Sequence, residues 1–130
     1  MHGSITRSVS SWPASTVLGY ALLLAGCIGG RPACETLPAE VEVTLAAETL
    51  SPSDPAVCRG ADVTLRVASE VDGVLHIHGY DEEVPATRVS VGEVLELAFI
   101  AEQSDQFLIE LHSDEDPRGV TVGILTVHEP

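Results

Sequence analysis

The 130-residue sequence contains no lysine, and six arginines oppose its 20 aspartates and glutamates. The formal net charge is −14 at pH 7, and a chain this acidic repels nucleic acid and anionic membrane surfaces. We therefore expect no nucleic-acid partner. Methionine occurs once, as the first residue, and aromatic residues make up only 4% of the chain. The core must be built mainly from valine, leucine and isoleucine.

The sequence also lacks the patterns of common enzyme sites. There is no G-x-S-x-G nucleophile motif, no phosphate-binding loop and no basic patch. The many carboxylates lie in turns, without a spacing that marks a general acid. We predict that the chain is not an enzyme.

The first 26 residues resemble a targeting segment. The run "STVLGYALLLAG" has 12 residues, which is too short for a stable membrane span but fits a signal-peptide core. It ends in "LLAGC", which resembles the bacterial lipobox, so Cys27 is the expected lipid attachment site. The alternatives are an ordinary signal peptide cleaved near "ACE" and a buried apolar helix.

The lipobox divides the chain into three parts. These are a signal peptide over residues 1–26, a linker over 27–39 and one domain over 40–130. Every acidic residue lies after residue 26, so lipid rather than charge would hold the protein at a membrane. The expected location is the cell envelope, on its periplasmic or extracellular face. The sequence is also compatible with a protein partner in the envelope.

Two cysteines remain if Cys27 carries lipid. Cys34 and Cys58 form an even pair in an oxidising compartment, and a disulfide between them is the favoured interpretation. Two free thiols are the alternative. Their wide separation and the lack of a nearby histidine argue against a CxxC redox pair or a zinc knuckle.

The rest of the chain alternates apolar and polar residues, which is typical of half-buried strands. In "DVTLRVAS" the apolar side chains Val63, Leu65 and Val67 fall on one face. "VEVTLA", "EVLELAFIA", "QFLIELH" and "VTVGILTVH" behave alike, and turn signals such as "SPSDP" and "SDEDPRG" separate the runs. About seven short strands at this spacing predict an all-β antiparallel sandwich or barrel.

The order of these runs resembles the cupredoxin fold, a Greek-key β-sandwich, and especially the cupredoxin-like lipoproteins of the bacterial envelope. The resemblance covers about residues 40–128. It rests on "VCRGADVTLRV", "GVLHIHGYD", "VSVGEVLELAFIAEQSDQFLIEL" and the closing "GILTV".

The resemblance implies a copper site, but this chain departs from it. Cupredoxins hold copper with one histidine near the start of an early strand and with Cys, His and often Met from a loop between the last two strands. His76 takes the place of the first ligand, whereas the loop "LHSDEDPRGVT" contains neither Cys nor Met. A blue copper centre requires the thiolate, so we predict that the chain is not a blue-copper electron carrier.

A histidine site remains. His76 and His78 are two residues apart, so in a strand both point to one face, and His112 ends a strand expected to approach them. Three imidazoles, with water or with Asp81, Asp114 or Glu115, would suit Cu²⁺ or Zn²⁺. "HIHG" also resembles a His-x-His motif of multicopper oxidases, which need several such pairs.

Other roles for these residues stay open at this point. The histidines could instead serve packing alone, bonded to backbone and carboxylates. Tyr80 is either a hydrogen-bond partner of the histidines or a core aromatic, and His128 is expected at the surface. The sequence thus predicts a lipid-anchored module that holds or delivers copper, or else a metal-free β-sandwich that binds or scaffolds an envelope partner.

Overall fold

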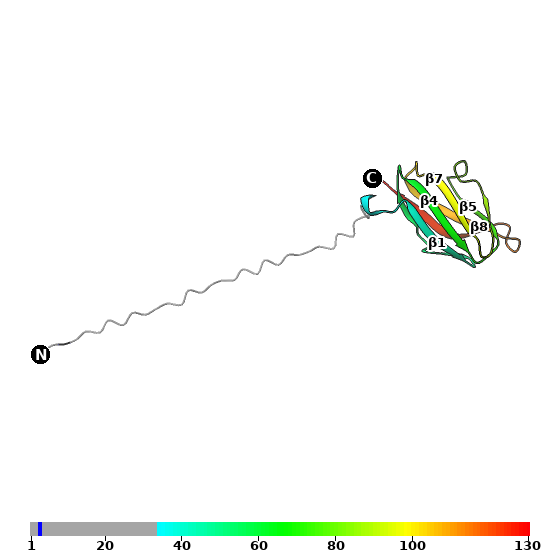
Figure 1. Ribbon diagram of the computed structural model, residues 1–130, viewed down its shortest axis with the longest axis horizontal. Coiled ribbons are helices and arrows are strands. Elements are labelled where there is room, and N and C mark those ends of the chain that lie inside the picture. The colour runs from blue at the N-terminus through cyan, green and yellow to red at the C-terminus, as the bar shows by residue number, and fades with distance from the viewer. Residues whose placement is uncertain (1–2, 4–33) are drawn as a thin grey trace.

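The computed structural model describes residues 3 and 34–130, and within them the chain forms two packed β-sheets (Figure 1). Cys27, the expected signal peptide apart from residue 3, and the first part of the expected linker lie outside the described residues. The described elements are η1 (Cys34–Thr36), β1 (Glu40–Ala46), β2 (Thr49–Ser51), β3 (Ala56–Cys58), β4 (Asp62–Ser69), β5 (Gly73–Ile77), β6 (Thr87–Val89), β7 (Val94–Ile100), β8 (Asp105–His112) and β9 (Val120–His128).

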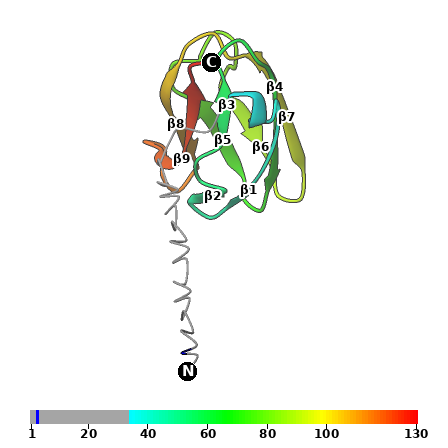
Figure 2. The ribbon, with the colours of Figure 1, turned by 90° about the vertical axis from the view of Figure 1, so that its left-hand side faces the viewer.

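The predicted all-β sandwich is confirmed, and the strand pairing adds two details. One sheet has the order β2-β1-β4-β7 and the other has the order β3-β9-β8-β5-β6 (Figure 2). Nine strands occur among the described residues where about seven were predicted, and three of them, β2, β3 and β6, have only three residues each. The pairs β1–β4 and β3–β9 are parallel, so the sheets are mixed rather than purely antiparallel. Period-two alternation is the same in both kinds of pairing and does not distinguish them.

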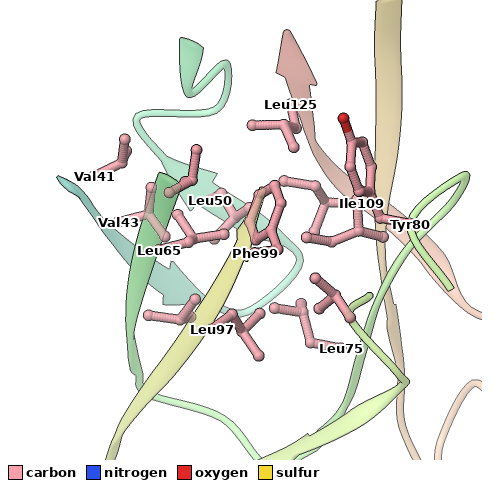
Figure 3. Close-up of a cluster of buried hydrophobic side chains, with 14 of the residues drawn as sticks. Val41, Val43, Leu50, Leu65, Leu75, Tyr80, Leu97, Phe99, Ile109 and Leu125 are labelled. Atoms are coloured by element: carbon pink, nitrogen blue, oxygen red, sulfur yellow. The ribbon is translucent and has the colours of Figure 1, made fainter. Parts of the chain in front are cut away.

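The apolar row of each strand forms the core between the two sheets. In β4 the side chains of Val63, Leu65 and Val67 are all buried, as the alternation predicts. Figure 3 shows this interior, where Phe99 and Ile109 from opposite sheets lie among aliphatic side chains. The interior therefore leaves the polar rows of both sheets facing outward, and one of these rows carries the histidines.

Tyr80 is a core residue, which resolves the two roles left open for it. Its side chain is only 1% exposed and packs against the rings of Phe99 and Phe107, with ring centroids 5.2 and 4.7 Å away. Its hydroxyl donates to the Gln103 carbonyl at 3.0 Å and accepts from the Gln103 N–H at 3.3 Å. Burial raises the pKa of this phenol. The tyrosine thereby fixes the turn that follows β5.

Cys34 and Cys58 form a disulfide, the pairing favoured over two free thiols. The bond links η1 to the end of β3, and Figure 1 shows η1 beside the C-terminus. Within residues 34–130, we find no helix of the length and apolarity that a membrane crossing requires.

Candidate metal centre

The two histidines of "HIHG" lie at the end of β5, on the outer face of the five-stranded sheet. His76 is the fourth residue of the strand and alternates with the buried Leu75 and Ile77. His78 follows the strand, and its N–H still donates to the Leu108 carbonyl of β8 at 2.9 Å. This bond continues the strand spacing, so both rings stand on the same face, with centroids 4.5 Å apart.

Strand β8 brings a carboxylate to this pair. In the antiparallel register His76 lies directly opposite Glu110, and Val74 lies opposite His112. Glu110 and His112 therefore project from the same face as the two β5-side histidines. His76, His78 and Glu110 each offer a ligand atom, and these atoms lie within 4.8 Å of one another.

Glu110 was not among the ligands proposed from the sequence. The chain offered one signal, because Glu110 and His112 repeat on β8 the two-residue spacing of His76 and His78. The register between the strands was needed to pair the two rows. The carboxylates suggested instead, Asp81, Asp114 and Glu115, do not belong to this three-residue group. The predicted ligand His112 is also outside the group, although its Nε2 atom lies 3.5 Å from Glu110 Oε2.

Glu110 is the centre of the cluster. Its Oε2 atom lies 2.8 Å from His78 Nε2 and 3.5 Å from His112 Nε2. The rings of His76 and His112 are farther apart, with centroids 6.3 Å from each other. Glu110 thus connects the pair near β5 with the histidine at the end of β8.

The chain also fixes the orientation of His112. Its Nδ1 atom donates to the Pro117 carbonyl at 3.1 Å, and this assigns the proton to Nδ1 because a carbonyl only accepts. The left-handed Gly119 lies against the ring, where a Cβ would approach His112 atoms to 2.7–2.9 Å. The remaining nitrogen, Nε2, is the one that faces Glu110. In a neutral ring this nitrogen carries a lone pair, and the carboxylate oxygen that it faces carries negative charge. The two atoms repel each other, and a cation bound by both would stabilise the arrangement.

The electrostatics favour an ionised Glu110. The hydrogen bond from His78 lowers the pKa of this carboxyl, and the charges of His78, His112 and His76 act in the same direction, against partial desolvation. Metal ligation requires the deprotonated carboxylate. The side chain is 22% exposed, so it is accessible to an ion from solvent.

The donor set fits Cu²⁺ or Zn²⁺ and does not fit blue copper. Two ligand atoms that each lie about 2.0 Å from one metal are separated by about 2.8–3.3 Å at angles between 90° and 109°. The 2.8 and 3.5 Å spacings around Glu110 are close to this range. A blue centre needs a cysteine thiolate. Both cysteines among the described residues are joined in the disulfide.

Comparison with known proteins identifies the fold. No protein-family model matches the chain, and no curated protein matches it. Among solved structures, the chain is similar to reduced auracyanin from the photosynthetic bacterium Roseiflexus castenholzii, with a TM-score of 0.55 and 15% identity. The match covers 71% of this chain and 98% of auracyanin.

A second similar structure is a multi-copper oxidase from Pseudomonas thermotolerans, with a TM-score of 0.51 and 18% identity. That match covers 69% of this chain but only 29% of the oxidase. At this level of identity the two matches establish the fold and not the activity. The chain therefore has the cupredoxin-like fold that its strand order resembles.

Proposed function

We propose that this cupredoxin-like domain binds one Cu²⁺ ion through His76, His78 and Glu110, with His112 as a fourth ligand. The convergence of imidazole nitrogens on the Glu110 carboxylate carries the proposal. Three nitrogens and one oxygen suit tetragonal Cu²⁺, and copper heads the affinity order of divalent ions for such donors. The same ligands accept Zn²⁺ more weakly.

The proposed site holds copper and does not act as a blue electron carrier, in which the copper changes its oxidation state. No thiolate is available among the described cysteines, and the methionine of the chain is residue 1. A copper bound by nitrogen and oxygen lacks the copper–thiolate charge transfer that makes blue centres blue. Storage or delivery of copper is the role that we infer, without catalysis.

Copper titration of the purified full chain tests the proposal. We expect one equivalent of Cu²⁺ to bind and to give a pale absorption band rather than an intense blue one. Copper at 100 times its dissociation constant should add about 2.7 kcal/mol to the free energy of unfolding. A chain that neither binds copper in stoichiometric amount nor melts at a higher temperature with it would contradict the proposal.

We also propose that the domain is held at the cell envelope by lipid on Cys27. The support is the sequence "LLAGC" after an apolar run, together with an acidic domain that has no charge attraction to a membrane surface. In membrane fractionation of cells, we expect Cys27→Ala to move the protein from the membrane to the soluble fraction. Unchanged membrane association of the variant would show that Cys27 is not the anchor.

A metal-free interaction module of the envelope is the second candidate. One observation favours it: each histidine of the cluster already has a polar partner in the protein, namely Asp81, Glu110 or the Pro117 carbonyl. The cluster can therefore be a structural network on a surface that binds an envelope protein. It predicts no copper-dependent change in melting temperature, which separates it from the copper site.

A further inference from the structure

The two nitrogens of His76 have different surroundings. The Nε2 atom contacts Asp81 Oδ1 from the turn after β5. An ionised carboxylate only accepts hydrogen bonds, so this contact places the proton on Nε2. In the neutral ring the other nitrogen, Nδ1, then keeps a lone pair for a metal.

Asp81 lies apart from the carboxylate at the centre of the cluster. It is not a member of the group formed by His76, His78 and Glu110. The pKa of Asp81 is lowered by its hydrogen bond with His76, and His76 is the sole charged residue contributing to that shift. The pKa of Glu110, in contrast, is lowered by His78, His112 and His76 together. The contacts agree, because Asp81 pairs with His76, whereas Glu110 pairs with His78 and His112.

The turn that carries Asp81 is built into the core. Gly79 adopts a left-handed conformation with φ of 88°, and a Cβ there would approach the Phe107 ring to 2.7 Å. Tyr80 is held in the core by Gln103, and its carbonyl accepts a bond from the Val84 N–H at 2.7 Å. The Gly79 N–H also reaches Asp81 Oδ2 at 3.4 Å. The backbone around Asp81 is therefore fixed, although its side chain is 57% exposed.

We propose that Asp81 is a positioning residue for the copper site and not one of its ligands. It holds the His76 ring with the proton on Nε2, so that Nδ1 is the atom that binds the metal. A carboxylate on the far nitrogen of a metal-bound imidazole orients the ring and raises its basicity. This inference rests on the metal site proposed above, and it assigns the tautomer and the binding atom of one ligand.

Nuclear magnetic resonance of the full chain tests the assignment directly. Histidine is labelled with ¹⁵N, and Zn²⁺ serves as a diamagnetic probe of the same ligands. Long-range ¹H–¹⁵N correlations distinguish protonated from metal-bound ring nitrogens, and the His76→Ala variant identifies the His76 signals. We expect Zn²⁺ on Nδ1 and a proton on Nε2 of His76.

Two contrary results are distinguishable. Zn²⁺ on Nε2 of His76 would overturn the role of Asp81 while leaving the metal site in place. Zn²⁺ that shifts none of the signals of His76, His78 and His112 would overturn the proposed metal site, and the role of Asp81 with it.

Substitution of Asp81 gives an independent measurement. We expect Asp81→Ala to weaken copper binding by about 10- to 100-fold, the range seen when a partner of a metal-bound histidine is removed. Asp81→Asn should lose less, because its amide oxygen still accepts the Nε2 hydrogen. Asp62→Ala is the matched control, since it removes the same charge from an exposed position at the start of β4. If Asp81→Ala and Asp62→Ala lose the same amount of copper affinity, Asp81 acts only through its charge and the proposal is wrong.

Discussion

Cu²⁺ binding should weaken by more than 100-fold when His76 and His78 are both replaced by alanine. The double variant keeps two of the four proposed ligands, Glu110 and His112, whose Oε2 and Nε2 atoms lie 3.5 Å apart. The expected loss exceeds the roughly 10- to 100-fold cost of removing the hydrogen-bond partner of a metal-bound histidine, because two direct ligands are removed. Calorimetric titration of wild type and variant with Cu²⁺ measures the difference.

His128→Ala is the matched control for this experiment. His128 ends β9, and it is not part of the cluster that offers metal ligands. The control removes one imidazole from the chain and should leave copper affinity unchanged. If the double variant and the control bind copper equally well, the ion binds elsewhere and the proposed site is wrong.

The double variant should remain folded, which keeps the result interpretable. The His76 and His78 side chains are 21% and 47% exposed and lie outside the core cluster. Surface substitutions of this kind usually change the free energy of unfolding by less than about 0.5 kcal/mol. The loss of His76 also removes the partner of Asp81, but that carboxylate faces solvent and can be hydrated. The melting temperature without copper checks this expectation.

The strands and their inward faces could be predicted from the sequence, because a strand with one buried face alternates apolar and polar residues. Val63, Leu65 and Val67 alternate with polar residues in the sequence and are buried in the structure. Tyr80 follows no such pattern, because it lies in a turn after the strand has ended. Its place in the core depends on Gln103, 23 residues later, and on rings from β7 and β8.

The candidate site was only partly predictable for a related reason. His76 and His78 are neighbours in the sequence, so their shared face follows from strand geometry. Glu110 joins them through the register between β5 and β8, which a single sequence does not specify. A shift of one residue in that register would place Ile109 or Leu111 opposite His76 and would turn the carboxylate to the core. The buried Ile109 and Leu111 oppose that shift, so the core fixes the site.

Removal of the disulfide should have the largest effect on stability. The bond joins Cys34 to Cys58 across 24 residues, and the chain-entropy estimate for such a loop is about 3 kcal/mol. For a domain of about 100 residues this corresponds to a melting temperature lower by roughly 12–24 °C. We expect this decrease in Cys34→Ser/Cys58→Ser, measured by thermal unfolding without copper. Wild type unfolded in the presence of a reducing agent should show a similar decrease and serves as the control.

The disulfide variant also separates stability from metal binding. Cys58 lies on β3, and β9 and β8 stand between β3 and the strand that carries His76. At a temperature where the variant is folded, its copper affinity should therefore equal that of wild type. A small change in melting temperature would mean that η1 is held by packing rather than by the bond. A large loss of copper affinity in the folded variant would mean that the disulfide supports the site through the sheet. The melting temperature and the copper affinity together show whether the disulfide stabilises the fold, the metal site or both.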